Sequence, residues 1–341
     1  MLIEQFDAKT DDDRLAACHQ IMVSGHPEDD PNMPEMTWRR FQAWWRYGFA
    51  SEPVETWLAT GDDGQPAGCY LLWLPERENR QNAFIALNVV RGCRRQGLGT
   101  ALAAHAAGQA ERAGRALLMS DTRVGAPGTA FARACGAQAG IQEVRRVLDV
   151  NADLLARVAG LRAGAEQHAA GYSLRSWSGL TPDGLLEQVS ALHNAMEDAP
   201  HDASVEPLRW DADRVRKEEE QDIEAGMRAY SVAALANDSG EMAALTQVYV
   251  DPDQSDWGYQ GVTAVTRPHR GHRLGMLVKT EMLQRLSELE PRIGAVETGN
   301  AGSNQYMIAV NEQIGFRVTD TFQNWEIEIA AARKLADQGA T

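Results

Sequence analysis

The segment RRQGLGTAL (residues 94–102) decides the fold, because a similar segment, RGHRLGMLV (residues 270–278), returns in the second half of the chain. Both are turns rich in arginine and glycine that lie between an apolar run and a helical pattern. They differ inside the turn, where the second segment has Arg273 and the first has Gly97. The pair indicates that one structural unit occurs twice and that its two copies have diverged.

The interval between the two segments recurs elsewhere in the chain. The same spacing, about half the chain, separates three pairs of residues: Arg91 and Arg267, Gly99 and Gly275, and Gly64 and Gly240. Gly64 and Gly240 each lie between two strand-like runs, in TGDDGQ and ANDSGE, which predicts a hairpin turn in each half. A constant spacing over several features favours an internal duplication.

Both halves predict the same order of elements. Each has three successive strands, a helix after the glycine turn, a further strand, a short helix and a last strand. In the first half these are residues 56–60, 68–74, 83–90, a helix from the turn, 115–122, 128–136 and 143–150; in the second they are 230–236, 242–250, 261–265, a helix from the turn, 292–299, 304–315 and 325–330. The predicted fold class is therefore α/β (α+β), with two tandem domains. We expect a domain over residues 1–150, a linking helix over 151–170 and a second domain over 171–341.

Composition restricts the classes of function. The formal net charge is −15, which disfavours nucleic acid as a partner and favours a cationic small molecule. The four cysteines form no C-x-x-C pair, and no spacing of ligands predicts a metal site. No apolar run is long enough to cross a membrane, and the acidic N-terminus is unlike a secretory signal, so we expect a cytoplasmic protein.

The glycine turn suits a diphosphate for a physical reason. The first backbone N–H groups of a helix are unpaired donors at the positive end of the helix dipole. Glycine at positions 97 and 99 lets the backbone approach an anion, and Arg94 and Arg95 add positive charge. The alternative is a turn that only starts a helix, and Arg273 gives this alternative more weight in the second half.

These residues resemble the GCN5-related N-acetyltransferase (GNAT) family in its tandem form, with two units in one chain. The family motif, Arg/Gln-x-x-Gly-x-Gly/Ala, is matched by Arg94, Gly97 and Gly99, and in part by Arg270 and Gly275. The second half is also similar to that of tandem members found in actinomycetes, including the clavulanic acid cluster type, which suggests secondary metabolism. The resemblance implies, in each unit, a mostly antiparallel mixed sheet with a splayed central strand and flanking helices.

The resemblance also implies acetyl-CoA as the acyl donor. The residues expected to bind it in the first unit are Asn88, Val89, Val90, Arg94, Arg95, Gln96, Gly97, Leu98, Gly99 and Thr100; those in the second unit are Ala264, Val265, Arg270, Gly271, His272, Arg273, Gly275 and Asn304. Backbone N–H groups near Val90 or Val265 are candidate donors to the oxyanion.

The tyrosine that many family members use as the acid is missing from both units, where its positions hold Ala132 and Asn311. The catalytic candidates are Tyr259, Tyr306 and Asn311, with packing as the favoured alternative for Tyr306. For the base, the family's geometry points near the start of the fourth strand, where the second unit also has Asp256 and Gln260. The first unit has Gln81, Asn82 and Ala83 there, none of which ionises. Glu297, on the fifth strand of the second unit, is another candidate for the base, with a solvated strand end as the favoured alternative.

Three further segments have structural interpretations. FQAWWRYGF (residues 41–49) predicts core or interdomain packing, RVRKEEEQDIE (214–224) predicts a solvated helix, and His193 is interpreted as a structural histidine.

The sequence therefore predicts an N-acetyltransferase that acts on a small-molecule amine, as a monomer or homodimer. The first unit would mainly hold acetyl-CoA, and the second would perform the transfer. The alternatives are an acyl-CoA sensor without catalysis, an O-acyltransferase and, less favoured, a protein acetyltransferase.

Overall fold

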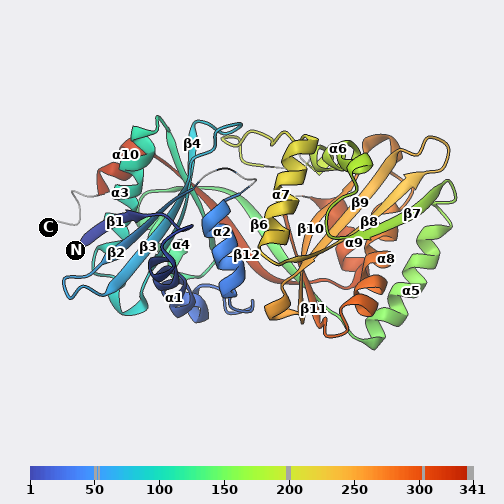
Figure 1. Cartoon of the computed structure of the whole chain (residues 1–341), viewed down its shortest axis with the longest axis horizontal. Helices are drawn as coiled ribbons and strands as arrows, with labels where there is room; N and C mark the ends of the chain where they lie inside the picture. The colour runs from blue at the N-terminus through green and yellow to red at the C-terminus, as the bar shows by residue number, and fades with distance from the viewer. Residues whose placement is uncertain (50–51, 53, 197–200, 302–303, 336–341) are drawn as a thin grey trace. The chain divides into compact units, whose positions relative to one another are not determined.

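The computed structural model describes residues 1–341 except 50–51, 53, 197–200, 302–303 and 336–341 (Figure 1). The chain forms two compact units. Unit 1 comprises residues 1–142, 202–206 and 320–341, and unit 2 comprises residues 143–201 and 207–319. These ranges differ from the expected 1–150 and 171–341, because segments distant in sequence complete each unit.

Unit 1 has a mixed sheet with strand order β1-β2-β3-β4-β5-β12. Its elements are β1 (Leu2–Phe6), α1 (Asp12–Asp29), α2 (Trp38–Tyr47), β2 (Val54–Thr60), β3 (Pro66–Trp73), β4 (Asn82–Val89), a 3-10 turn (Arg91–Cys93), α3 (Leu98–Arg112), β5 (Leu117–Arg123), α4 (Pro127–Ala134), β12 (Arg317–Glu328) and α10 (Ile329–Arg333).

Unit 2 repeats this architecture with strand order β7-β8-β9-β10-β11-β6. Its elements are β6 (Gln138–Asp149), α5 (Ala152–Glu166), β7 (Tyr172–Ser178), a 3-10 turn (Asp183–Leu185), α6 (Leu186–Met196), α7 (Ala212–Glu224), β8 (Arg228–Ala236), β9 (Met242–Val250), a 3-10 turn (Pro252–Gln254), β10 (Trp257–Val265), a 3-10 turn (Arg267–His269), α8 (Leu274–Leu289), β11 (Ala295–Ala301) and α9 (Gln305–Ile314).

Each sheet is covered by helices on both faces. In unit 1, one face packs apolar side chains against α1 and α2, and the other packs them against α3 and α10. In unit 2, one face packs against α6 and α7 and the other against α5 and α8. The predicted order of elements and both hairpin turns are confirmed, with Gly64 and Gly240 at φ of 76° and 73°.

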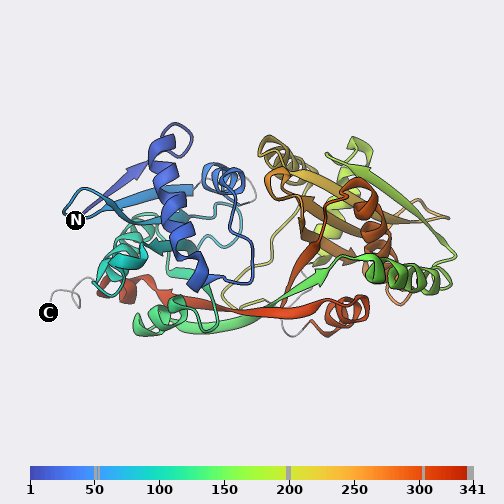
Figure 2. The same ribbon diagram turned by 90° about the horizontal axis from the view of Figure 1, so that it is seen from below.

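The last strand of each half pairs in the opposite unit from the one expected. Residues 143–149 of β6 pair with β11 of unit 2, and residues 322–328 of β12 pair with β5 of unit 1. The physical reason is that β6 leads directly into α5, from which only Val150 and Asn151 separate it. Because α5 packs in the core of unit 2, the end of β6 lies in unit 2 as well. Figure 2 shows β12, in red, leading into α10 beside α3.

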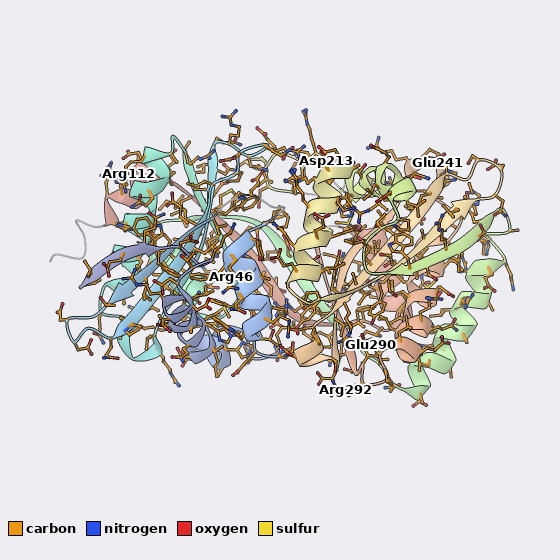
Figure 3. All side chains as sticks on the ribbon, viewed as in Figure 1. Arg46, Arg112, Asp213, Glu241, Glu290 and Arg292 are labelled. Atoms are coloured by element: carbon orange, nitrogen blue, oxygen red, sulfur yellow. The ribbon has the colours of Figure 1, made fainter. Side chains whose placement is uncertain are left out.

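The expected linking helix is part of a core. Leu154 and Val158 of α5 are buried against α8, as α10 is against α3 in unit 1. The far end of α8 is also anchored, because Glu290, labelled in Figure 3, accepts hydrogen bonds from Arg228 and from the hydroxyl of Tyr230. Each helix that starts at a glycine turn is therefore held by a helix that follows an exchanged strand.

Candidate active site

In each unit the central strand leaves its parallel neighbour part of the way along. In unit 1, β4 and β5 pair over Asn82–Phe84 and Leu117–Met119, and in unit 2, β10 and β11 pair over Trp257–Tyr259 and Ala295–Glu297. Both strands of each pair continue beyond this short ladder. The sheets therefore open at the carboxyl ends of these strands, as the family resemblance implied, and the two glycine turns lie there.

The turn of unit 1 starts α3 with unsatisfied donors. Gly97 is the N-cap in the left-handed region (φ 83°), and the first helical hydrogen bond runs from the N–H of Ala101 to the carbonyl of Gly97. No described side chain caps this helix, whereas Asp11, Thr37, Asn151, Asp211 and Asn304 cap α1, α2, α5, α7 and α9. The amides of Leu98, Gly99 and Thr100 thus remain unsatisfied at the start of α3, near the opening between β4 and β5.

The turn of unit 2 has the same shape with its glycine moved. Arg273 is the N-cap of α8 in the left-handed region (φ 54°), and among the described residues no side chain caps this helix either. Gly271 is left-handed (φ 89°) where the equivalent residue of unit 1 is Arg95 (φ 62°). Each turn therefore needs two left-handed residues, and each copy has glycine at one and arginine at the other. Arg273 does not interrupt the turn.

This exchange of glycine and arginine predicts a change in stability. A non-glycine residue in the left-handed region is strained by roughly 1–2 kcal/mol, part of which is offset by the greater freedom of glycine in the unfolded chain. We expect Arg95→Gly and Arg273→Gly each to raise the free energy of unfolding by about 0.5–1 kcal/mol. Denaturant unfolding measures this change.

Alanine variants of the turn glycines provide the complement. A Cβ at Gly97 or Gly271 would have open space, so backbone strain alone should make Gly97→Ala and Gly271→Ala destabilising. Gly92→Ala is the control, because Gly92 also has open space but no left-handed φ, and it should change stability little. An equal loss in all three variants would contradict the role given to the left-handed positions.

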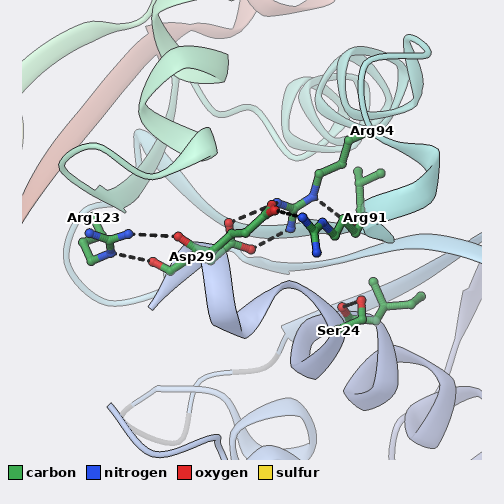
Figure 4. A network of polar contacts seen from close by, with 8 residues as sticks. Ser24, Asp29, Arg91, Arg94 and Arg123 are labelled. Atoms are coloured by element: carbon green, nitrogen blue, oxygen red, sulfur yellow. Dashed lines mark hydrogen bonds and ion pairs between the residues drawn. The ribbon is translucent and has the colours of Figure 1, made fainter. Parts of the chain in front are cut away.

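The Arg94 side chain is committed to α1. Its guanidinium donates to Asp29 at 2.7 Å and to Glu28 at 3.2 Å, and its Nε donates to the carbonyl of Val89 (Figure 4). Arg123, at the end of β5, donates to the backbone carbonyls of Asp29 and Glu28, each at 2.9 Å. The end of α1 is thus bonded both to the turn after β4 and to the end of β5. Arg94 was expected to add charge for a phosphate, but here two carboxylates neutralise it.

The residues expected to be catalytic are not brought together. Tyr259 is buried and its hydroxyl donates to Gln254, Tyr306 is 74% exposed, and Asn311 is fully buried and donates to Asn300 at 2.8 Å. Asn304, expected to bind the coenzyme, caps α9.

Two other candidates are also engaged elsewhere. Glu297 lies 3.5 Å from Arg145 in an ion pair. The amide of Val90 donates to the carbonyl of Ala67 at 2.9 Å, so it is not a free oxyanion donor.

Strand β10 of unit 2 has a β-bulge that the equivalent strand β4 of unit 1 lacks. Strand β4 pairs with β3 in one unbroken register, but β10 shifts by one residue against β9 between Gln260 and Thr263. Gly261 and Val262 therefore face the single residue Gln247, which takes backbone N–H groups out of the ladder at the point where β10 leaves β11. This bulge was not among the features predicted from the sequence, although a glycine inside the run WGYQGVTAV (residues 257–265) is a signal for one.

Acidic side chains and a tyrosine lie beside the bulge. The ring of Tyr249 covers Gly261, since a Cβ there would be 2.7 Å from Cε2 of the ring. Burial and then the negative charges of Asp222, Glu218 and Glu219 raise the pKa of Tyr249, so these residues of α7 are its electrostatic neighbours. Burial, reinforced by Asp222, raises the pKa of Glu218 to about 8. The helix expected to be solvated therefore presents a carboxyl group with altered acidity.

The same positions in unit 1 are aromatic. Counting from the N-caps Thr37 and Asp211 places Trp44 at the position of Glu218, and counting from the hairpin glycines places Trp73 at that of Tyr249. Both indoles pack against the core formed by α1 and α2, which agrees with the packing predicted for residues 41–49.

The start of β4 in unit 1 is covered by residues 202–206, which we call the arm. Asn82 and Gln81 donate to the carbonyl of Ser204 at 2.8 and 3.3 Å. Asn79 exchanges hydrogen bonds with the backbone of Glu206. Gln81 and Asn82, which occupy in unit 1 the position where the family geometry places the base, therefore hold the arm.

The remaining predictions concern His193, metals and membranes. Burial lowers the pKa of His193 to about 4, and its ring packs on Trp210 with centroids 4.4 Å apart, in keeping with a structural histidine. Within the described ranges, no group of three or more His, Cys, Asp or Glu side chains is arranged to hold a metal ion. None of the described helices combines the length and apolar character needed to cross a membrane.

Comparisons with known proteins agree with this architecture. Residues 15–137 match the model of the acetyltransferase (GNAT) family. The chain is similar in structure to a tandem GNAT protein from the clavulanic acid biosynthesis pathway, solved without AcCoA, with a TM-score of 0.81, 29% identity and coverage of 96% of this chain and 98% of that one. It shares its fold with a GCN5-related N-acetyltransferase from Sphaerobacter thermophilus, with a TM-score of 0.65, 16% identity and coverage of 96% and 95%. No curated protein matches the sequence.

Proposed function

We propose that the chain is a tandem acetyltransferase of the GNAT family, in which unit 2 transfers an acetyl group from acetyl-CoA to the amine of a small molecule. Unit 1 would hold a second acetyl-CoA. The observation that carries the division is the bulge at Gly261 and Val262 in β10, which has no counterpart in β4.

The residues present in both turns fit a coenzyme diphosphate. The first amides of α3 and α8 are free of side-chain caps within the described structure, and each lies at the positive end of a helix dipole. The backbone at Leu98–Thr100 and at Leu274–Met276 would hold the phosphates. Bound acetyl-CoA supplies the acyl group as an activated thioester.

Acyl transfer in unit 2 needs a base, and Glu218 is the residue we propose. An alkyl ammonium titrates near roughly 10, so it must lose a proton before it attacks. A carboxylate with a pKa of about 8 accepts that proton more readily than an ordinary glutamate does. The neighbouring charges of Glu219 and Asp222 favour a cationic acceptor.

The backbone amides released at the bulge would stabilise the negative charge that develops on the thioester oxygen. Such donors act without reorganisation when the strand is rigid. The Tyr249 ring over Gly261 shields this point from water on the α7 face. Coenzyme A is a tolerable leaving group, because an alkyl thiol titrates near roughly 8.5.

A pair of matched variants tests the division of roles. Gln96 and His272 occupy equivalent exposed positions of the two turns, so Gln96→Glu and His272→Glu each place a carboxylate beside one proposed diphosphate site. Like charge should weaken binding there by about tenfold or more. Native mass spectrometry with acetyl-CoA should show two bound equivalents in the wild type and a weakened second equivalent in each variant.

Turnover distinguishes the two sites. At subsaturating acetyl-CoA, release of free CoA with a panel of amines should fall by about tenfold or more in His272→Glu and be retained in Gln96→Glu, and the reverse pattern would assign catalysis to unit 1. The second candidate function is an acyl-CoA sensor, favoured by the Arg94 ion pairs and the arm that occupy unit 1. Binding of two coenzymes with no turnover for any amine would support that function instead.

A further inference from the structure

The bulge of β10 is braced from the α8 face by a buried polar network. Gln260, just before the bulge, donates from Nε2 to the hydroxyl of Thr246 at 3.0 Å and to the carbonyl of Gln247 at 2.5 Å. Thr263, just after the bulge, meets the same hydroxyl of Thr246 at 2.8 Å. The side chain of Gln260 thus bonds to the backbone carbonyl of Gln247, the residue opposite the bulge. The residues on both sides of the bulge, Gln260 and Thr263, bond to the hydroxyl of Thr246.

Lys279 of α8 completes this network. Its Nζ donates to Oε1 of Gln260 at 3.0 Å and lies 4.8 Å from the centroid of the Phe316 ring. Only 2% of the residue is exposed. Within the described part of the chain, no carboxylate forms an ion pair with it, and burial alone lowers its pKa to about 7.

A buried lysine without a carboxylate partner reduces stability, so its presence calls for a function. Counting from Gly99 and Gly275 places Ala103 at the position of Lys279 in unit 1, where β4 has no bulge. A methyl group therefore suffices for packing on the helix that covers a regular strand. Lysine and bulge occur together, in the unit to which we assign the chemistry.

We infer that Lys279 is a positioning residue for acyl transfer, because it fixes Gln260 and thereby holds the amides of the bulge on β10 toward the reacting carbonyl. This inference rests on the proposed function of unit 2. The ammonium donates to Gln260 and places a positive charge behind the strand on which negative charge is to be stabilised. No step of the reaction passes through Lys279 itself, since it transfers no proton and forms no bond.

No acidic group in the described structure serves as a counter-ion for the Lys279 ammonium. The acidic groups on α8 and on the described elements that pack around it are engaged with other residues or exposed. Glu281 pairs with Arg162 and Arg285, Glu166 with Arg162, Glu290 with Arg228 and Tyr230, Glu297 with Arg145, and Tyr259 with Gln254, whereas Asp153, Glu288 and Glu312 lie at the surface. The charge on Lys279 therefore acts on the bulge without local neutralisation.

Lys279→Met tests the inference, with Thr280→Val as the matched control. Thr280 is also fully buried on α8, but among the described residues its hydroxyl donates to carbonyls of its own helix alone, those of Met276 and Leu277. We expect Lys279→Met to lower kcat by about tenfold to 100-fold while the KM for acetyl-CoA stays within about twofold, because the lost interaction matters in the transition state. Thr280→Val should leave both constants near those of the wild type.

The pH profile supplies a readout that loss of packing would not change. Burial lowers the pKa of Lys279 to about 7, and loss of its proton removes the positive charge behind the strand, so the wild type should have an alkaline limb on which activity falls as pH rises. Lys279→Met should lack this alkaline limb and be slow throughout. Lys279→Arg, whose guanidinium does not titrate, should retain activity at high pH. Unchanged kcat in Lys279→Met, or an alkaline limb that persists in Lys279→Arg, would overturn the inference.

Two measurements apply even to protein that does not turn over. Amides of residues 257–265 should exchange hydrogen faster in Lys279→Met than in the wild type, and equal exchange would count against the bracing role. The variant should also melt at a higher temperature at pH 6, because the folded wild type then carries a buried cation, and this difference should shrink toward pH 10. Absence of turnover in the wild type with every amine tested would instead contradict the proposed function, without bearing on the bracing role of Lys279.

Discussion

Replacing Glu218 with glutamine should reduce kcat/KM for acyl transfer by about 100-fold or more at pH 8, the effect of removing a general base. The amide keeps the size of the side chain but cannot accept a proton. Burial raises the pKa of Glu218 to about 8 and the base acts only when deprotonated, so the wild type should have an acid limb on which activity rises with pH, and Glu218→Gln should lose this limb. Steady-state release of CoA over pH 5.5–9.5, a range of about four pH units that spans both limbs, measures it.

The control is Glu220→Gln on the same helix. Glu220 is exposed, so its substitution removes the same formal charge from α7 without touching the face that packs on Tyr249. It should retain nearly full activity. Equal losses in the two variants would mean that α7 acts only through its total charge, by attracting a cationic amine. Activity of Glu218→Gln equal to the wild type would exclude Glu218 as the base.

The two ionisable groups assigned to unit 2 make the combined profile informative. Glu218 must be deprotonated and Lys279 protonated, and their pKa values of about 8 and about 7 place the optimum between these values. The bell-shaped curve then reports apparent constants of the pair. Glu218→Gln and Lys279→Met should remove opposite limbs, which is a stricter test than either loss of rate alone.

The sequence predicted the features that depend on local patterns. The equal spacing of Gly64 and Gly240, and of the two arginine turns, predicted the duplicated order of elements that the structure shows. The exchange of β6 and β12 was not predictable, because pairing in a sheet depends on contacts distant in sequence, and both strands have similar patterns. The solvated helix predicted for RVRKEEEQDIE (residues 214–224) was incomplete for a related reason. The charge pattern of the helix does not reveal which of its carboxyl groups lies near Tyr249.

The site was predicted in part. The turn residues lie at the open ends of the strands. Of the two tyrosine candidates, Tyr259 is buried and bonded to Gln254, and Tyr306 is exposed. The role of Lys279 could not be predicted from the sequence. A single lysine on the apolar face of α8 leaves the helical period of that face unchanged, so the pattern still predicts an ordinary amphipathic helix. The partner of Lys279, Gln260, lies on another element, so only the fold reveals the contact.

Adding one methyl group at Gly261 should be nearly as damaging as loss of the base. The Cβ of Gly261→Ala would lie 2.7 Å from Cε2 of Tyr249, closer than atoms approach in folded proteins, so either the ring or the bulge must move. Displacement of the bulge misplaces the amides proposed to stabilise the oxyanion, for which losses of about 100-fold in kcat are typical. Binding of acetyl-CoA to unit 2 should change little, because its turn is untouched.

A double-mutant cycle separates this clash from general damage to the strand. Tyr249→Leu removes the atom that the new methyl group meets, so Gly261→Ala combined with Tyr249→Leu should recover most of the rate lost by Gly261→Ala alone, beyond what Tyr249→Leu itself costs. Additive losses would show that glycine is needed there for another reason. Full activity of Gly261→Ala with two coenzymes bound would remove the bulge from the chemistry, because a strand that tolerates such a shift does not hold its amides in the geometry that the transfer requires.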